Sequence, residues 1–256
     1  MSNWTERFSL QGKRACVTGG SQGIGAEICG VLADAGADIA TIALDQEGLD
    51  QVAETVRGHG RQCETITADF TTIEGPRAAA AKALEAFGTI DILVNCAGIA
   101  PIEPLLETSM ENWERTMAIN LRAPLLMAQK LAPGMIAQKA GKIVNISSQA
   151  SVIAIDGHAT YSASKAGLNA LTRDMSCEWA KHNIQANAVC PTIIMTPLGR
   201  EVWGEEAKAA PMLERTPLGR FGEPIEVADM VLYLASPASD LVNGTTMLID
   251  AGFSII

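Results

Sequence analysis

Three side chains in the second half of the chain have types and a spacing that suit proton transfer. Tyr161 and Lys165 are four residues apart in a stretch that reads as helix, so both side chains lie on one face, one turn apart. A phenol with an ordinary pKa of about 10 is a poor acid at neutral pH, but an adjacent ammonium favours the phenolate and lowers that pKa. Tyr161 is therefore a candidate for exchanging a proton with an alcohol or carbonyl oxygen, to which Ser148 would donate a hydrogen bond.

The position of Ser148 favours a catalytic role for Tyr161 and Lys165 over a structural one. A tyrosine near a lysine on a helix is usually an amphipathic surface pair when it occurs alone. Ser148, however, follows the apolar run 142–147, which predicts a buried parallel strand. Open α/β sheets bind their ligands at the carboxyl ends of such strands, so Ser148 stands where chemistry is expected.

Strand-like and helix-like segments alternate along the whole chain. Because this alternation implies right-handed crossovers and parallel strands, we expect one doubly wound α/β sheet of the Rossmann type, covered by helices on both faces. No linker or repeat divides the sequence, so residues 1–256 are expected to form a single domain with a substrate lid around 197–217. The seven predicted strands are 14–18, 38–44, 62–67, 90–95, 142–147, 185–190 and 246–250, and the predicted helices are 23–35, 46–58, 73–87, 109–138, 159–182 and 224–236.

A glycine-rich turn after the first strand points to a nucleotide. Gly19, Gly23 and Gly25 follow the strand that ends at Thr18, and they open a helix. Backbone without side chains approaches a pyrophosphate closely, and the helix N-terminus faces it. The spacing G-x-x-x-G-x-G differs from the usual dinucleotide fingerprint, so the strand before it and the helix after it carry the prediction.

Two further strand ends are expected to face the same crevice. Asp69 follows the third strand, where it would either meet the adenine or cap the helix that begins near Thr72. The segment 95–98, Asn-Cys-Ala-Gly, follows the fourth strand and would line the ribose side of the nucleotide.

Composition disfavours several classes of protein. The chain has 256 residues, 48% of them hydrophobic, and a net charge of −10 without clusters of Lys or Arg, which disfavours a nucleic-acid or anionic-membrane partner. Six cysteines without C-x-x-C pairs and only three histidines make a metal site unexpected and suit a reducing compartment. The N-terminus has no basic start followed by an apolar stretch, and no apolar run approaches about 18 residues. We therefore expect a soluble cytoplasmic protein.

The glycine turn and five later features together resemble the short-chain dehydrogenases/reductases over essentially the whole chain. These features are the segment 95–98, Asn120, Ser148, Tyr161 and Lys165. The resemblance implies a seven-stranded Rossmann fold, an NAD(P)-dependent oxidoreductase acting on CH–OH groups, and usually a tetramer. It also implies that Asn120, Ser148, Tyr161 and Lys165 form a catalytic tetrad.

Two departures from the common family pattern narrow the resemblance. Cys96 stands where the family commonly has Asn, and Thr192 follows Pro191 where the family has Gly. The segments 190–196 and 212–221 are similar to the branch of L-xylulose (dicarbonyl) reductases and polyol dehydrogenases. Residues 147–149, Trp203 and His158, which lies three residues before Tyr161, fit that branch too.

The strand ends and the resemblance together define the residues expected to hold a nicotinamide dinucleotide. The resemblance implies that Ile194 and Thr196 contact the carboxamide of the nicotinamide. The full expected set is Gly19, Ser21, Gln22, Gly23, Ile24, Gly25, Asp45, Asp69, Phe70, Asn95, Ala97, Gly98, Tyr161, Lys165, Pro191, Ile194 and Thr196.

The choice of dinucleotide depends on the residues after the second strand. NAD enzymes place an acid there for the ribose hydroxyls, and NADP enzymes an arginine for the 2′-phosphate. Ala43 and Leu44 occupy the positions where the family most often has that acid and that arginine, and Asp45 follows them. With no basic residue near Leu44, a phosphate dianion would face Asp45 unneutralised. We therefore predict NAD, with NADP as the alternative and an N-cap as the other role for Asp45.

Polar residues beside Ser148 predict a substrate with several hydroxyls. Gln149 directly follows Ser148, and His158 lies one turn before Tyr161, so both would bond a short polyol or ketose of the L-xylulose or erythrulose/threitol type. Trp203 in the lid would close over the carbon chain and exclude water. The alternatives are that His158 is a surface residue and that Trp203 is a packing anchor of the lid.

Two other functions use the same fold. A reductase of 3-oxoacyl thioesters shares the tetrad, but it would offer a basic mouth to a phosphopantetheine carrier, whereas 197–217 carries three basic residues against four glutamates. A non-catalytic nucleotide sensor would be expected to lack Tyr161 or Lys165, and both are present.

The two long predicted helices carry two further predictions. Pro124 lies four residues after Asn120. Proline lacks the N–H that would bond the carbonyl of Asn120 in a regular helix. The resulting kink would either free that carbonyl to hold a water between Lys165 and solvent, as a proton relay, or serve packing alone. Both helices also carry more apolar residues than one buried face needs, which predicts a subunit interface and a homotetramer. Examples are Leu125, Leu126, Met127, Leu131, Leu168, Leu171, Met175 and Trp179.

Overall fold

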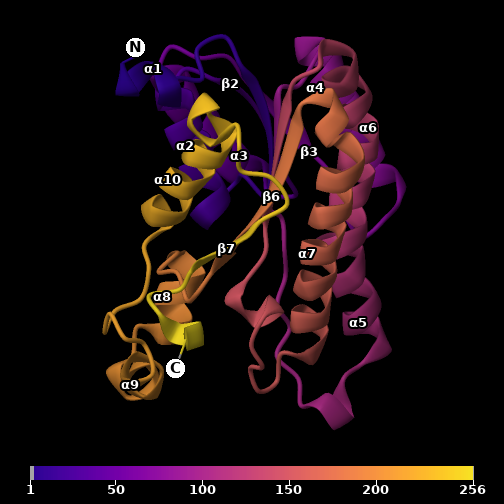
Figure 1. Ribbon diagram of the computed structural model, residues 1–256. Coiled ribbons are helices and arrows are strands. Elements are labelled where there is room, and N and C mark those ends of the chain that lie inside the picture. The colour runs from indigo at the N-terminus through magenta and orange to yellow at the C-terminus, as the bar shows by residue number, and fades with distance from the viewer. Residues whose placement is uncertain (1–2, 256) are drawn as a thin grey trace.

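A seven-stranded parallel β-sheet forms the centre of the computed structural model, which describes residues 3–255 (Figure 1). The strand order is β3-β2-β1-β4-β5-β6-β7, and every adjacent pair runs parallel. The doubly wound α/β fold and all seven predicted strands are confirmed. The strands are β1 (Arg14–Thr18), β2 (Asp38–Ala43), β3 (Cys63–Thr67), β4 (Ile92–Asn95), β5 (Gly141–Ile146), β6 (Ile184–Pro191) and β7 (Thr246–Ile249).

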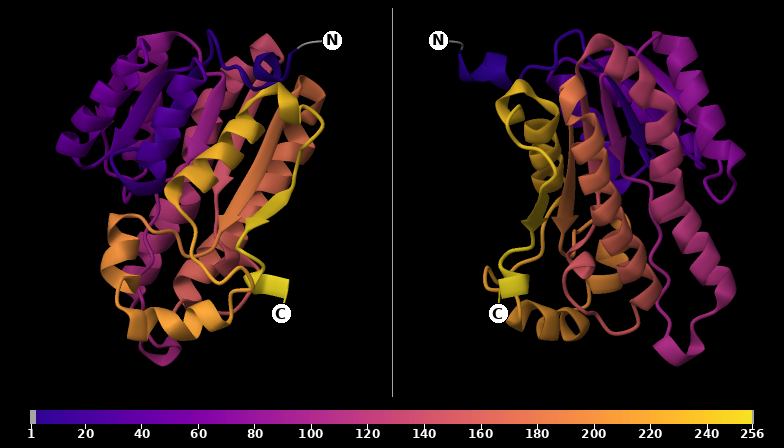
Figure 2. Two further views of the ribbon diagram at one scale, coloured as in Figure 1. Left: turned by 90° about the vertical axis from the view of Figure 1, so that its left-hand side faces the viewer. Right: turned by 45° about the vertical axis from the view of Figure 1, so that its right-hand side comes forward.

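Helices cover both faces of this sheet. Figures 1 and 2 show α2, α3 and α10 on one face and α4, α6 and α7 on the other. Each layer buries its own apolar cluster against the strands, with Ile28 and Val231 in the first cluster and Met127 and Met175 in the second. The helices are α1 (Trp4–Phe8), α2 (Gly23–Asp34), α3 (Gln46–Gly58), α4 (Glu74–Phe87), α5 (Met110–Met117), α6 (Ala123–Gln138), α7 (Ala159–Trp179), α8 (Pro197–Trp203), α9 (Glu206–Glu214) and α10 (Pro224–Ala235).

The chain changes direction across the sheet between β1 and β4. It moves outward from β1 to β3 and then returns to place β4 on the other side of β1. Loops after these two strands leave toward opposite sides, which opens a crevice at their carboxyl ends. Thr18 at the end of β1 holds the two sides together, because its Oγ1 accepts the backbone N–H groups of Cys96 at 3.0 Å and Ala97 at 3.2 Å.

The long helix expected over 109–138 is interrupted. A π-helical turn, Ala118–Arg122, separates α5 from α6, and the N–H of Ala123 bonds the carbonyl of Ala118 five residues back. Pro124 occupies the first turn of α6, where its missing N–H is tolerated. The predicted irregularity next to Asn120 is therefore present, in the form of a wider turn.

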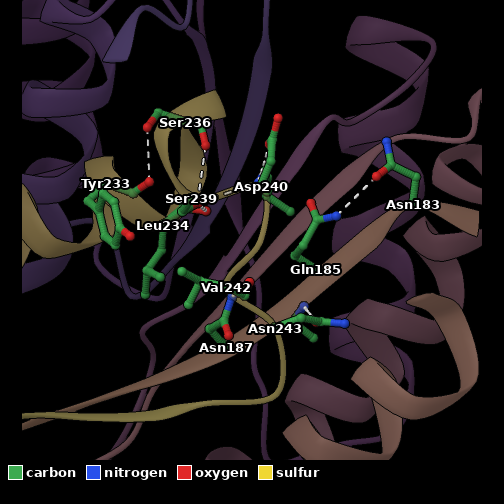
Figure 3. Close-up of polar contacts among 12 residues, drawn as sticks. Asn183, Gln185, Asn187, Tyr233, Leu234, Ser236, Ser239, Asp240, Val242 and Asn243 are labelled. Atoms are coloured by element: carbon green, nitrogen blue, oxygen red, sulfur yellow. Dashed lines mark hydrogen bonds and ion pairs between the residues drawn. The ribbon is translucent and has the colours of Figure 1, made fainter. Parts of the chain in front are cut away.

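The far edge of the sheet is fixed at its amino end by side-chain amides and hydroxyls, as Figure 3 shows. Asn187 of β6 donates to the carbonyl of Val242 at 2.9 Å and accepts the N–H of Thr245 at 3.1 Å. Ser239 donates to the carbonyls of Leu234 and Ser236. These bonds tie the end of α10 and the loop before β7 to the sheet.

The apolar residues of α6 and α7 mainly serve the interior of the subunit. Five of the eight that we expected to exceed one buried face are buried within the subunit, because both helices pack against the strands and against each other, and α6 also packs against α4. Only Leu125, Leu171 and Trp179 are half-buried, so the surplus is smaller than expected. Between residues 3 and 255, no helix is both long enough and apolar enough to pass through a lipid bilayer.

Candidate active site

A cleft of about 620 Å³ opens at the carboxyl edge of the sheet. Its walls come from the glycine turn, the loops after β4 and β5, the first turns of α7, and the start of α8. The cleft brings together most residues predicted from the sequence. These are Gly19, Ser21, Gln22, Gly23, Ile24, Gly25, Ala97, Gly98, Ser148, Tyr161, Lys165, Pro191, Ile194 and Thr196.

The glycine turn is packed so closely that side chains do not fit. A Cβ on Gly19, whose φ is +69°, would lie 2.7 Å from the Cα of Ala97, and one on Gly25 would lie 2.0 Å from the carbonyl oxygen of Gly19. The backbone thus forms a bare cradle in front of the N-terminus of α2, with Gly23 as the first helical residue. This cradle fits the pyrophosphate of a dinucleotide, since backbone N–H groups and the helix dipole both favour an anion there.

Ser148 presents a hydroxyl at the end of β5. Its backbone is extended, and its Oγ accepts the N–H of Ala150 at 3.1 Å, which leaves the hydroxyl proton available to the cleft. Tyr161, on the first turn of α7, lines the same cleft as Ser148.

The expected depression of the Tyr161 pKa by Lys165 is wrong for this structure. Burial raises the pKa of Tyr161 above its ordinary value, and the hydrogen bond from Ser148 opposes this rise only in part. Lys165 Nζ lies 5.7 Å from the centre of the phenol ring and donates to the carbonyl of Ile146 at 2.7 Å. Burial also lowers the pKa of Lys165 to about 8, which weakens its hold on the positive charge.

Asn120 acts as a clamp between the β4 loop and α7. Its Oδ1 accepts the N–H of Ile99 at 2.9 Å, and its Nδ2 donates to the carbonyl of Ile99 at 2.9 Å and to the Oγ of Ser164 at 3.0 Å. A Cβ on Gly98 would lie 3.3 Å from Lys165 Nζ and 3.4 Å from Asn120 Oδ1, so the loop passes directly over both side chains. The side chain of Asn120 thus positions the loop.

Four of the expected cofactor residues lie outside the walls of the cleft. Asp69 accepts the N–H and the hydroxyl of Thr71, both at 2.8 Å, and these bonds lower the pKa of its carboxyl. Phe70 is buried in the core. Asn95 is buried too, with its Nδ2 bonded to Asn145. Asp45 stands at the N-cap position of α3, yet its side chain accepts no capping hydrogen bond.

Of the four expected substrate residues, only Ser148 lines the cleft, and Gln149, His158 and Trp203 do not. Gln149 is 2% exposed, and its Oε1 has no hydrogen-bond partner. His158 is half-buried, with its ring 6.3 Å from that of Tyr161 and its Nδ1 donating to the carbonyl of Asp156 at 2.7 Å. Trp203 packs on Phe221, at 6.0 Å between ring centres, as a lid anchor would.

Several cleft residues were not predicted from the sequence. Each lies within two residues of a predicted residue at a strand end or at the start of the lid, and that proximity was the available signal. They are Ile99, Ala100, Ile146, Ser147, Thr192, Pro197 and Leu198, whereas Cys96 belongs to the predicted segment 95–98. Across residues 3–255, no three His, Cys, Asp or Glu side chains converge in a way that would hold a metal ion.

Comparison with known proteins identifies the family. A family model described as enoyl-(acyl carrier protein) reductase matches residues 19–254. The D-threitol dehydrogenase of Mycolicibacterium smegmatis is 37% identical over 97% of this chain and 95% of its own length. The chain belongs to the short-chain dehydrogenase/reductase family. The L-xylulose reductase of Bos taurus is 40% identical to this dehydrogenase, over 95% of this chain and 97% of its own length.

The fold of this short-chain dehydrogenase matches solved structures equally well. A gluconate 5-dehydrogenase from Burkholderia cenocepacia, solved in complex with NADP and tartrate, superimposes with a TM-score of 0.93 at 36% identity, over 99% of this chain and all of that one. The resemblance stated from the sequence is thus confirmed. The dehydrogenase is an oxidoreductase that acts on CH–OH groups with a nicotinamide cofactor.

Proposed function

We propose that this dehydrogenase interconverts a short polyhydroxylated alcohol and the corresponding ketose, with NAD as its cofactor. The observation that carries the proposal is the cleft itself, where Ser148, Tyr161 and Lys165 face the bare glycine cradle. The names of the threitol and xylulose relatives support a sugar alcohol as substrate.

The residues divide the work of the reaction as follows. In the direction of reduction, the Ser148 hydroxyl donates a hydrogen bond to the substrate carbonyl, and Tyr161 delivers a proton to that oxygen. In the direction of oxidation, the phenolate of Tyr161 removes the proton. A bound nicotinamide supplies or accepts the hydride at the substrate carbon, and its oxidised ring adds a positive charge that favours the phenolate. Lys165 holds the ribose next to that ring.

The selection of hydroxylated substrates falls to Gln149 and His158. The buried Oε1 of Gln149 has no hydrogen-bond partner, which costs free energy. A substrate hydroxyl that donates a hydrogen bond to this oxygen would remove that cost. His158 donates through Nδ1 to the Asp156 carbonyl, so its Nε2 is left to accept a second hydroxyl. A site built in this way rejects alcohols without such hydroxyls.

The preference for NAD rests on Asp45. Its carboxylate is exposed and is not used as a helix cap, so it is available to the ribose hydroxyls. No Lys or Arg occurs between Asp38 and Val56, so nothing on this segment would neutralise a 2′-phosphate. A ratio of kcat/KM for NADP over NAD of one or more would overturn the preference.

The basic residues of the lid are already engaged, which argues against an acyl-carrier substrate. Arg200 bonds Glu223 at 2.8 Å, Lys208 lies over the ring of Trp203, and Arg215 lies over the ring of Phe253. A phosphopantetheine carrier would find few free cations there. The proposal also places the enzyme in the cytoplasm, since its six free cysteines suit a reducing compartment.

The test compares a polyol with a simple secondary alcohol of similar size. Gln149→Leu and His158→Leu should each lower kcat/KM for the polyol roughly 5- to 150-fold, which corresponds to about 1–3 kcal/mol of lost transition-state binding. Neither substitution should change kcat/KM for the simple alcohol. His182→Leu, in the short 3-10 turn just after α7, is the matched control and should leave kcat/KM for both substrates unchanged. Equal losses for both alcohols would remove the polyol assignment, and turnover of an acetoacetyl thioester instead of erythrulose or xylulose would replace it.

A further inference from the structure

Gly48 lies in α3, where a glycine destabilises the helix and its presence needs a structural explanation. It lies in the first turn of the helix, and glycine has a lower helix propensity than alanine. Its backbone is ordinary helix, since it is absent from the glycines with positive φ. The reason for glycine is therefore space around Cβ and not backbone conformation.

The side chain of Asp45 and the backbone of Ser21 occupy that space. A Cβ on Gly48 would lie 2.5 Å from Oδ2 of Asp45, 2.6 Å from the carbonyl oxygen of Ser21 and 2.9 Å from the Cβ of Ser21. Ser21 belongs to the glycine turn and lines the cofactor cleft. The carboxylate at the end of β2 and the backbone of the turn thus meet over Gly48, and a methyl group would separate them.

The two oxygens that converge on this point are both acceptors. Asp45 is the N-cap residue but makes no capping bond, so its carboxylate points toward the turn instead of the helix. A neighbouring pair of hydroxyls is the group that two such acceptors bind, because each hydroxyl donates one hydrogen bond. A phosphate dianion has no proton to donate and is repelled by the carboxylate.

We propose that Gly48 determines cofactor selectivity, by leaving the room in which Asp45 and the Ser21 carbonyl form a joint acceptor for the ribose diol of NAD. The inference rests on the proposed use of NAD. Gly48 is a positioning residue, since it has no side chain to touch the nucleotide and acts through Asp45.

Gly48→Ala tests the proposal, because its methyl group displaces Asp45 or Ser21. Gly58 is the matched control at the other end of α3, since a Cβ there meets nothing within 4 Å. Dissociation constants of NADH and NADPH are measured from nicotinamide fluorescence, without turnover. Gly48→Ala should lower the preference for NADH by about 10- to 100-fold, the value of hydrogen bonds to a charged group, and Gly58→Ala should leave it unchanged.

Asp45→Ala and the double variant show whether Gly48 acts through the carboxylate. Asp45→Ala by itself should abolish the preference for NADH over NADPH. The double variant of Asp45→Ala and Gly48→Ala should show no further loss of that preference. Thermal unfolding gives a second readout. Gly48→Ala should lower Tm in the wild-type background and lower it less beside Asp45→Ala, because one of the two clashes is then absent.

Each other outcome refutes a different statement. If Asp45→Ala loses the preference while Gly48→Ala keeps it, NAD use stands and the role of Gly48 falls. If Gly48→Ala weakens NADH and NADPH by the same factor, Gly48 only shapes the turn and the proposal falls. If the wild-type enzyme binds NADPH as tightly as NADH, both the proposed use of NAD and the role of Gly48 are refuted.

Discussion

Replacing Asn145 by leucine should destabilise the enzyme through a buried chain of amides. Asn145 of β5 is fully buried, and its Oδ1 accepts from Nδ2 of Asn95 at 2.8 Å. Its Nδ2 donates to Oγ1 of Thr172 at 2.8 Å. The chain joins β4, β5 and α7, which carry the β4 loop, Ser148 and the Tyr161 helix, so Asn145→Leu cuts the contact among the elements that build the site.

The magnitude follows from which groups lose their partners. Asn95 already has an unpartnered Oδ1, and the substitution leaves its amide nitrogen unpaired as well. Thr172 loses a donor but still donates to the carbonyl of Leu168 at 2.7 Å. Each buried polar group left unpaired costs about 1–3 kcal/mol, and burial of the more apolar leucine offsets part of the sum. We expect the free energy of unfolding to fall by about 2–4 kcal/mol.

Urea unfolding at one fixed protein concentration measures this change, because subunit association would otherwise shift the midpoint. Asn187→Leu is the control from the neighbouring strand, since its partners Val242 and Thr245 are separate from this chain. The double variant of Asn95→Leu and Asn145→Leu should be about 1–2 kcal/mol more stable than the sum of the single effects. Additive effects at Asn95 and Asn145, or a loss under about 0.5 kcal/mol for Asn145→Leu, would refute the reasoning.

Three other predictions concern an ion pair at the start of α10, the π-helical turn and the assembly. Arg220 lowers the pKa of Glu226 to about 2, so the pair stabilises the fold above the ordinary carboxyl pKa of 4.5 and is lost as pH falls toward 2. Because Arg220 is exposed to solvent, Arg220→Gln should lower Tm only slightly at pH 7 and not at all below pH 2, as thermal unfolding against pH would show. Pro124→Ala should slow proton transfer, and unchanged rates with no ordered water beside Asn120 would refute the relay. Light scattering at micromolar concentration should give the mass of a homotetramer, and a monomer mass would contradict that assembly.

The sequence predicted the elements of the fold because each signal was local. The apolar run before Ser148 and the glycines after Thr18 needed only their neighbours in the chain to be read. The four-residue spacing of Tyr161 and Lys165 in like manner placed both on one helix face.

The properties that failed or went unseen depend on contacts between distant segments. Burial raises the pKa of Tyr161 because segments distant in the chain enclose its ring in the folded protein. The clamp from Asn120 to Ile99 spans 21 residues, and the close approach of Gly48 to Ser21 joins α3 to the glycine turn. No local pattern encodes these distances.

The π-helical turn at Ala118–Arg122 has a consequence for insertions and deletions. A turn of this kind holds one residue more than an α-helical turn, and one residue of an α-helix corresponds to about 100° of rotation. Deleting a single residue there would restore a regular helix and turn α6 by that angle relative to α5. Thr116 before the turn and Leu131 after it are both buried, so one of the two faces would then leave the interior. The number of residues in this segment is therefore fixed by the packing of the helices on either side of it.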